Sequence, residues 1–520
     1  MPLHPPTKHC ILSQSQNPQK TMLHLLLAIL SLTVLLGCRE KPRALVVFHT
    51  NDIHGHFVPE PASWRDDNAP VGGIAALEYH LTRLRAQYPN SIYLDAGDLM
   101  TGNPICAIEY EGVKGAALLE MLHRAGVTAE CLGNHEFDLG ADHVRDFIAA
   151  SPYPLLCANM RDKHGNQPLT LAAYQVTENG LRIGIIGLIL NDLKDVVAKA
   201  NIQEFIVADA ASAAQKYIDE LDPVTDVIIL LTHMGVDEDS LLATQIHNAD
   251  VIVGGHSHTR LNEPRRVNNV IIVQAGSYCK NLGVLELAVA RDTVTSYQGR
   301  LEELLYDDRA PRTALATFAD SLDVVIHARY GQVIGDLEER WTPAYYGGSR
   351  VGNWICDRLR ERYHADVALV NGGGIRTTWN PGPITMLDVL ELLPFENAVT
   401  TFDATGAELL KTAREQAAAQ GLEKHGALEM SGMTVSYRSR SDRAELVEAR
   451  IGGVPIDSDK SYHVGTIDYV AVSQPDRYLG FTPRNLETTA SLLSAVITEE
   501  IKAAKTPLRA DSTQRLYQVK

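Results

Sequence analysis

The sequence is poor in cysteine and aromatic residues, and its basic residues are outnumbered by acidic ones. Seven of 520 residues are Cys, 6% are aromatic, and 47 Lys and Arg stand against 64 Asp and Glu. The resulting net charge of −17 argues against binding to a nucleic-acid polymer, because a phosphate backbone requires a basic surface. A small phosphorylated ligand stays possible, since local charges or a metal ion can override the global field. The 45% hydrophobic and 21% charged residues exclude a disordered, collagen-like or polytopic membrane protein.

Only one long apolar run is present, from Leu23 to Leu36. It is too short to cross a bilayer as a helix, which takes about 20 residues, but it fits the core of a signal peptide. The run ends in Leu35-Leu36-Gly37-Cys38, which resembles the lipobox of bacterial lipoproteins. We therefore expect residues 1–37 to be a signal peptide and Cys38 to carry lipid, giving an exported, membrane-anchored protein in the periplasm or on the cell surface. The alternative is an ordinary secretory signal with a chance Cys.

The cysteines beyond the lipobox are widely spaced and form no CxxC pair. They predict neither a dense disulfide framework nor a zinc ribbon. They are Cys106, Cys131, Cys157, Cys279 and Cys356.

Apolar, β-branched runs alternate with amphipathic stretches from Ala44 onward. This alternation is typical of an α/β architecture with strands buried on both faces. Examples of predicted strands are 91–95, 182–188 and 226–232, and helices are predicted at 74–87 and 239–247. The pattern becomes polar around residues 300–340, and a second α/β or α+β region follows. The chain is long enough for two or three domains.

Five predicted strands each end in a segment that carries His, Asp or Asn, usually beside Gly. Because the carboxyl ends of strands in open α/β sheets converge on one crevice, we expect these side chains to meet. The segments are Asn51–Gly55, Asp95–Asp98, Gly133–Asp138, Thr232–Gly235 and Gly254–His258.

These segments offer the donors of a dinuclear metal site. Oxygen and imidazole ligands without thiolates suit Zn²⁺, Mn²⁺, Co²⁺ or Fe. A carboxylate such as Asp95 can bridge two ions about 3.5–4 Å apart, an arrangement suited to phosphoryl displacement. A single His after a strand is more often a buried histidine without a ligand, and a single Asp-Ala-Gly-Asp is more often a turn. Five such segments in order, each after a strand, favour metal binding. The candidate ligands are Asp52, His54, Asp95, Asn134, His233, His256 and His258.

In their order and their residues, the five segments resemble the motifs of the calcineurin-like metallophosphoesterases, and more closely those of the secreted 5′-nucleotidase family. The resemblance implies a four-layer αββα domain at about residues 40–305, a helical linker at 306–334 and a smaller C-terminal substrate domain at 335–515. It implies one metal on Asp52, His54, Asp95 and His258. The second would lie on Asp95, Asn134, His233 and His256, with Asp95 bridging.

His135 and Asp138 are three residues apart, so the carboxylate can orient the imidazole. The alternative is that Asp138 caps a helix that begins near Leu139. By resemblance the pair stabilises the transition state and protonates the leaving group. Asp138 also favours a 5′-nucleotidase, because the related 2′,3′-cyclic phosphodiesterase/3′-nucleotidases typically have Asn there.

A predicted strand at 366–370 leads into Asn371-Gly372-Gly373-Gly374-Ile375-Arg376. Such a Gly-rich loop lets backbone amides approach an anion, and Arg supplies a planar cation for phosphate. The alternative is a tight turn with a surface Arg. By resemblance Arg350 and Arg376 bind phosphate, Asn371 in the loop that contains Gly373 binds the nucleoside, and Phe395 stacks on the base.

The sequence departs from the family at residues 467–476. Tyr469 can supply the second stacking ring, but the usual Gly-Gly-Asp turn is absent. We expect hydrolysis of nucleoside 5′-monophosphates to nucleoside and phosphate by a hydroxide activated at two divalent metals. The alternatives on the same scaffold are a UDP-sugar hydrolase and a 2′,3′-cyclic phosphodiesterase/3′-nucleotidase. A non-catalytic nucleotide-binding lipoprotein is disfavoured because the candidate ligands are intact.

Overall fold

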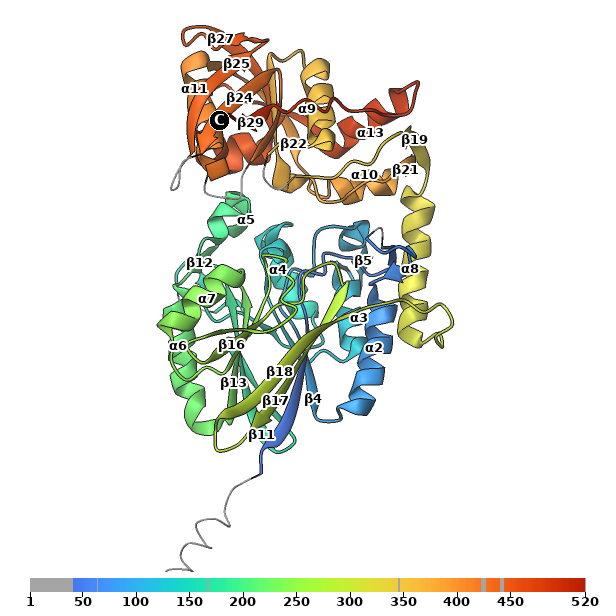
Figure 1. The fold of residues 1–520 in the computed structure, drawn as a ribbon, viewed down its shortest axis with the longest axis vertical. Coiled ribbons are helices and arrows are strands. Elements are labelled where there is room, and N and C mark those ends of the chain that lie inside the picture. Colours follow the sequence, from blue (N-terminus) through green and yellow to red (C-terminus); the bar gives the residue numbers. More distant parts are fainter. Residues whose placement is uncertain are drawn as a thin grey trace, which may run out of the picture.

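The computed structural model describes residues 41–519 except 63, 166–167, 345–346, 422–426 and 440–443. The predicted signal peptide and Cys38 lie outside the described residues. Two α/β domains are stacked along the long axis, and helix α8 (Ala314–Tyr330) runs from the first to the second (Figure 1). None of the helices in the described ranges is both long enough and apolar enough to span a membrane.

The N-terminal domain contains two six-stranded sheets with a parallel centre in each. The first has the order β18 (Val294–Glu303), β17 (Asn281–Val289), β1 (Arg43–Thr50), β4 (Ser91–Asp95), β7 (Ala129–Cys131) and β8 (Leu155–Leu156). The second has the order β10 (Ala173–Glu178), β11 (Leu181–Ile189), β13 (Val227–His233), β14 (Val251–Gly254), β16 (Val270–Val273) and β15 (Arg265–Val267).

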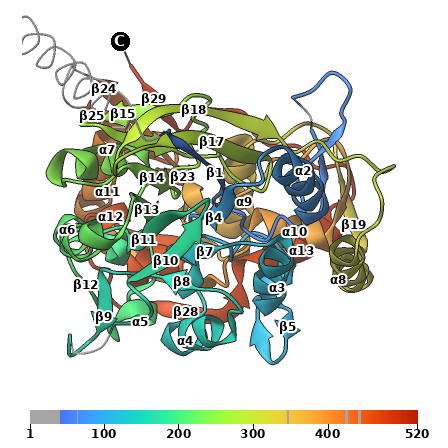
Figure 2. The same ribbon diagram turned by 90° about the horizontal axis from the view of Figure 1, so that it is seen from below.

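The two faces of strand β1 show how the domain is layered. Leu45 and Val47 belong to the apolar cluster between the sheets, whereas Val46 and Phe48 belong to the cluster that includes the covering helices. Helices α2 (Ile74–Gln87) and α3 (Ala116–Ala125) lie on one outer side, and α6 (Ala210–Leu221) and α7 (Val236–Gln245) on the other (Figure 2). The expected four-layer αββα arrangement is confirmed.

The C-terminal domain has a separate apolar core. Its larger sheet has the order β23 (Leu428–Ser431), β20 (Val367–Asn371), β27 (Ser461–Ile467), β22 (Ala398–Thr405) and β28 (Glu487–Leu492). The smaller sheet has the order β26 (Val454–Pro455), β25 (Ala444–Ile451), β24 (Met433–Ser439) and β29 (Leu516–Gln518). The main helices are α9 (Arg350–Arg362), α10 (Met386–Leu392), α11 (Gly406–Gly421) and α13 (Leu493–Ala503).

The predicted elements differ from the observed ones mainly at their ends. Helix α7 begins at Val236, three residues before the predicted start, because Gly235 with φ 92° turns the chain into the helix. Asp237, Glu238 and Asp239 then occupy its first turn, where the helix dipole stabilises acidic side chains. Strand β18 continues through Glu303, so the polar pattern that begins near residue 300 is still strand at its start.

Candidate metal centre and domain interface

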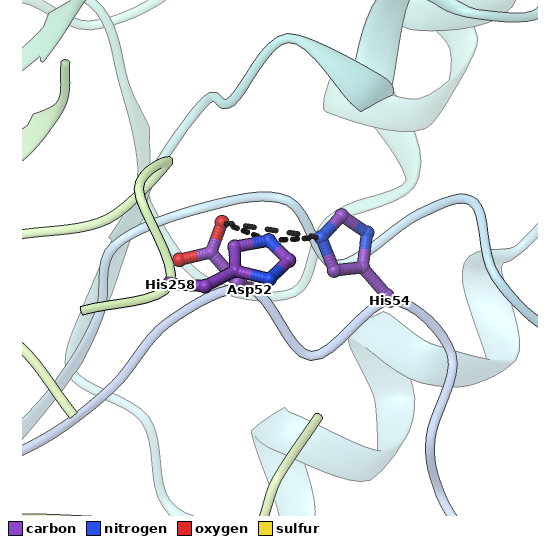
Figure 3. A group of neighbouring side chains, drawn as sticks. All are labelled: Asp52, His54 and His258. Carbon is purple, nitrogen blue, oxygen red and sulfur yellow. Dashed lines mark hydrogen bonds and ion pairs between the residues drawn. The ribbon is translucent and has the colours of Figure 1, made fainter. Parts of the chain in front are cut away.

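The loops that follow β1 and β14 bring Asp52, His54 and His258 together (Figure 3). Asp52 Oδ1 lies 3.4 Å from His258 Nε2 and 3.9 Å from His54 Nε2, and the two imidazole nitrogens are 3.1 Å apart. All three residues have φ between 52° and 54°, a region that L residues seldom occupy. Such strained backbone at a cluster of donors is typical of functional sites.

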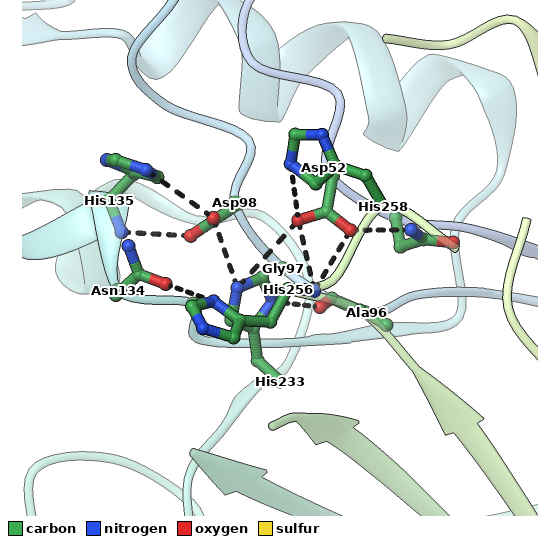
Figure 4. Close-up of polar contacts among 12 residues, drawn as sticks. Asp52, Ala96, Gly97, Asp98, Asn134, His135, His233, His256 and His258 are labelled. Atoms are coloured by element: carbon green, nitrogen blue, oxygen red, sulfur yellow. Dashed lines mark hydrogen bonds and ion pairs between the residues drawn. The ribbon is translucent and has the colours of Figure 1, made fainter. Parts of the chain in front are cut away.

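A second group of donors consists of Asp98, Asn134, His233 and His256 (Figure 4). Asp98 Oδ2 lies 3.1 Å from His233 Nε2, and Asn134 Oδ1 lies 2.8 Å from His256 Nδ1. Asp98 Oδ2 is also 3.8 Å from His54 Nε2. Asp98 therefore contacts imidazole nitrogens of both groups, and more closely than Asp52, whose Oδ1 lies 3.9 Å from His233 Nε2.

The prediction that Asp95 bridges the two groups is not what the structure shows. Asp95 is the last residue of β4, and its buried carboxylate accepts hydrogen bonds from Thr50 Oγ1 at 2.5 Å and Gly97 N at 3.0 Å. Gly97, with φ 82°, turns the chain so tightly that a Cβ there would lie 2.7 Å from the Cys131 carbonyl oxygen. The turn carries Asp98 into the centre instead. The Gly directly before Asp98 was the sequence signal that could have identified it.

The backbone orients two of the histidines in the way that metal ligands are oriented. His54 Nδ1 donates to the Thr101 carbonyl at 2.8 Å, and His233 Nδ1 donates to the Ala96 carbonyl at 2.7 Å. Because a carbonyl can only accept, each Nδ1 carries a proton, and the two Nε2 atoms lie 3.8 and 3.1 Å from Asp98 Oδ2. Metal-bound histidines typically donate their other N–H to such a partner.

The pKa values of the histidines in the centre are also consistent with binding of a metal cation. Burial holds the pKa of His54 well below its usual range, and burial together with His233 lowers the pKa of His256 to about 3. Burial disfavours the charged form of His233 as well, but the carboxylates of Asp98 and Asp52 raise its pKa to about 10. The contact between His233 and Asp98 is therefore one that a proton or a metal ion stabilises. Together with four imidazoles and two carboxylates, this fits two divalent cations.

His135 lies beside this centre and is oriented by Asp138. Its Nδ1 lies 2.6 Å from Asp138 Oδ2, and its Nε2 is 3.9 Å from Asp98 Oδ2. Burial lowers the pKa of His135, but the carboxylates of Asp138 and Asp98 outweigh it and the net change is upward. The alternative interpretation of Asp138 as a helix cap is wrong, because α4 (Ala141–Ala150) has Gly140 at its N-cap.

The C-terminal domain places Arg376 and Phe395 against the centre. Arg376 Nη2 lies 3.5 Å from His54 Nε2, and its guanidinium is 6.0 Å from the Phe395 ring centroid. The Phe395 and His135 rings are 5.7 Å apart. Asn371 is buried and lines a small cavity with Phe395, and the Gly373 carbonyl accepts from Arg376 Nη1 at 3.4 Å.

Two of the predicted substrate residues lie elsewhere. Arg350, the first residue of α9, pairs with Glu339, and 48% of its side chain is exposed. Tyr469 packs its ring on Tyr478 at 5.9 Å, and its hydroxyl donates to the Val196 carbonyl at 3.3 Å. In this domain arrangement, Tyr469 contacts the N-terminal domain instead of stacking opposite Phe395.

The segment that departs from the family pattern forms a contact between the domains, which sequence reasoning missed. Gln474 is buried, and its Nε2 donates to the carbonyls of Lys194 at 2.7 Å and Val197 at 3.3 Å. Arg477 donates to the carbonyl of Asp195. Elsewhere in the interface, Asn103 Nδ2 donates to Glu391 Oε1 at 2.6 Å. These contacts hold Arg376 and Phe395 over the centre.

The fold and the donor set are those of the metallophosphoesterase class. The family profile described as "Calcineurin-like phosphoesterase" matches residues 45–260, and the one described as "5'-nucleotidase, C-terminal domain" matches residues 333–478. The chain belongs to the 5′-nucleotidase family of phosphoesterases, whose two domains it contains in this order.

Similar proteins include an endonuclease and several 5′-nucleotidases. The chain is 27% identical over 493 residues to a 5'-nucleotidase of Diplobatis ommata, covering 83% of each protein. It is 26% identical over 500 residues to Endonuclease YhcR of Bacillus subtilis (strain 168), which covers 89% of this chain but only 40% of that longer protein. The crystal structure of a 5'-nucleotidase precursor from Thermus thermophilus superposes with a TM-score of 0.82 at 26% identity, covering 92% of this chain and 99% of that one.

Lowering the pH is expected to weaken metal binding, because protons and metal ions compete for the same histidine. Below pH 10 the metal-free centre holds a proton on His233, and neither His54 nor His256 holds one near neutrality. A metal ion must displace that proton, so its affinity should fall about tenfold or more for each unit of pH from 8 to 6. Titration with Zn²⁺ against a competing chelator measures the slope. The variant His327→Asn, on the exposed side of α8, should show the same slope, whereas a pH-independent affinity would contradict this assignment.

Proposed function

We propose that the protein hydrolyses nucleoside 5′-monophosphates to nucleoside and phosphate with two divalent cations. One cation would be held by Asp52, His54, Asp98 and His258, and the other by Asp98, Asn134, His233 and His256. When bound, the cations activate water and neutralise the phosphate charge. The observation that carries the proposal is that Arg376 and Phe395, from a separate domain, lie against this donor set and beside His135.

The side chains of this centre divide the work. Arg376 presents a planar cation that binds and orients the phosphate oxygens. Asp138 accepts the Nδ1–H of His135 and favours its imidazolium form, whose Nε2 proton is available for the leaving oxygen. A water molecule gives one proton to solvent and its oxygen bonds to phosphorus, the bond from phosphorus to the 5′ oxygen breaks, and that oxygen takes the proton from His135 Nε2. Phe395 offers an aromatic face for the base.

A second candidate is hydrolysis of another phosphate ester in the same centre: UDP-sugars, 2′,3′-cyclic nucleotides or 3′-nucleotides. It is supported by the position of Tyr469, whose hydroxyl contacts the Val196 carbonyl and whose ring packs on Tyr478. The name of the Bacillus subtilis relative, an endonuclease, also supports a diester substrate.

A substrate panel tests these proposals. Purified mature protein is assayed for release of phosphate or nucleoside from 5′-, 3′- and cyclic nucleotides and UDP-glucose, with a divalent metal or with excess chelator. We expect 5′-monophosphates to be hydrolysed fastest and chelator to abolish the activity. Preferential hydrolysis of a cyclic nucleotide or UDP-glucose would overturn the substrate assignment. Full activity in metal-free buffer would overturn the role of the metals.

We also propose that the mature protein is exported and anchored to a membrane through lipid on Cys38. The apolar run Leu23–Leu36 and the Leu-Leu-Gly-Cys sequence at its end support this. Replacing Cys38 by Ser should move the protein from the membrane fraction and abolish labelling by a fatty-acid probe. Unchanged membrane association would contradict the anchor.

A further inference from the structure

We propose that Thr101 is a positioning residue that joins the His135–Asp138 pair to the metal-binding loop through its hydroxyl. This inference rests on the proposed function, because it concerns protonation of the leaving group. Thr101 lies in the loop between β4 and the short helix η1 (Pro104–Ala107), three residues after Asp98. It was not among the residues singled out from the sequence.

Thr101 makes two contacts that connect the parts of the site. Its Oγ1 donates to Asp138 Oδ2 at 2.7 Å, the same oxygen that lies 2.6 Å from His135 Nδ1. Its carbonyl accepts from His54 Nδ1 at 2.8 Å. One residue therefore sets the position of a candidate metal ligand through its backbone and that of the orienting carboxylate through its side chain.

The backbone at Thr101 is strained, which argues that the side chain has a role. Its φ is 63°, and a β-branched residue in this region is a genuine outlier. Glycine would relieve the strain but would remove the hydroxyl. The loop cannot simply relax, because a Cβ on the next residue, Gly102, would lie 2.3 Å from the His54 carbonyl oxygen. Strain of this kind persists where surrounding contacts hold it and is concentrated at functional sites.

The hydroxyl determines how firmly Asp138 is held. The Asp138 carbonyl accepts from Asn201 Nδ2 at 2.8 Å, which fixes the backbone, whereas Thr101 fixes the carboxylate. Without the hydroxyl the carboxylate can rotate, and His135 loses its single orientation and tautomer. The consequence should depend on the leaving group. An alkyl oxygen needs the proton from His135 as it departs, whereas p-nitrophenolate leaves without it.

The test compares two esters in four variants. Thr101→Val and Thr101→Gly remove the hydroxyl, Thr101→Ser retains it, and Thr225→Val is a matched control that loses a buried hydroxyl bonded to the Leu221 carbonyl at 2.9 Å. We expect Thr101→Val and Thr101→Gly to lower kcat for a nucleoside 5′-monophosphate about 10- to 100-fold, a part of the roughly 10²–10⁴ typical of general acid catalysis. The kcat for p-nitrophenyl phosphate should change less than about threefold, and Thr101→Ser and Thr225→Val should stay near the wild type.

Equal losses on both esters, or no loss on either, would overturn the positioning role. Wild-type protein that is inactive toward every ester would overturn the proposed function instead. In that case ¹⁵N NMR of His135 still decides the positioning role. At a pH high enough for the imidazole to be neutral, the wild type should show one tautomer protonated at Nδ1 and Thr101→Val and Thr101→Gly a mixture. An identical spectrum in all variants would contradict the inference.

Discussion

Replacing Asp98 with Ala is expected to lower kcat/KM for phosphate release by about a thousandfold or more, corresponding to roughly 4 kcal/mol of transition-state stabilisation. Asp98 Oδ2 lies 3.1 Å from His233 Nε2 and 3.8 Å from His54 Nε2, so its loss removes the carboxylate shared by both groups of donors. The imidazoles of His54 and His233 would then have only the more distant Asp52 carboxylate, whose Oδ1 lies 3.9 Å from each Nε2. Metal content should fall together with activity, measured by elemental analysis of protein dialysed against a fixed metal concentration.

Asp95→Asn is the matched comparison for Asp98→Ala. Burial and the neighbouring carboxylates of Asp52 and Glu136 raise the pKa of Asp95 to about 7, although Thr50 and Gly97 donate hydrogen bonds to it. Asn has the shape of the protonated side chain, so the variant should retain two metal ions and most of the activity. The reverse result, with loss of metal in Asp95→Asn and normal binding in Asp98→Ala, would restore Asp95 as the bridging ligand.

Replacing His135 with Ala is expected to lower kcat for nucleoside 5′-monophosphates by about 10²–10⁴, the usual contribution of a general acid. The imidazole is held by Asp138 at 2.6 Å, and its Nε2 points toward the metal centre, 3.9 Å from Asp98 Oδ2. Because it is not in the proposed ligand set, the number of bound metal ions should not change. Steady-state kinetics and elemental analysis on the same preparation separate the two effects.

The substrate dependence of His135→Ala provides its control. Hydrolysis of p-nitrophenyl phosphate, whose leaving group needs no proton, should fall much less than hydrolysis of a nucleotide. A variant that loses metal, or that loses activity equally on both esters, would show that His135 supports the centre structurally. His143→Ala, on α4 in the same domain, removes an imidazole whose Nε2 contacts the Lys114 carbonyl and should leave both activities near the wild type.

The convergence of the segments after the strands could be predicted from the sequence because it follows from short-range rules. A buried strand that leads into a Gly-containing turn must place its next polar residues at one edge of the sheet, and five such turns converge in the structure. The same rule did not distinguish Asp95 from Asp98 within the segment Asp95–Asp98, because the sequence alone does not give the path of the turn at Gly97. In a sequence with two carboxylates three residues apart, only the backbone path decides which one faces inward.

The contacts between the domains could not be predicted from the sequence. Gln474 and Arg477 bind backbone carbonyls, and a carbonyl is present at every position, so no residue pattern marks the partner segment. Thr101 escaped notice for a similar reason, because its role depends on a left-handed backbone and on Asp138, 37 residues later. The sequence predicted which segments after the strands contribute to the centre. It could not predict the position of one loop relative to another.

The contact of residues 469–477 with residues 194–197 is chemically one-sided. Tyr469, Gln474 and Arg477 contribute side chains, whereas the opposite segment contributes main-chain oxygens to these hydrogen bonds. Substitutions among residues 194–197 that preserve the turn leave these hydrogen bonds in place, but a single change at Gln474 removes two of them. Side chains can therefore change among residues 194–197 without loss of these hydrogen bonds, whereas those of Tyr469, Gln474 and Arg477 are constrained. The side chains that determine these hydrogen bonds between the domains therefore all belong to the C-terminal domain.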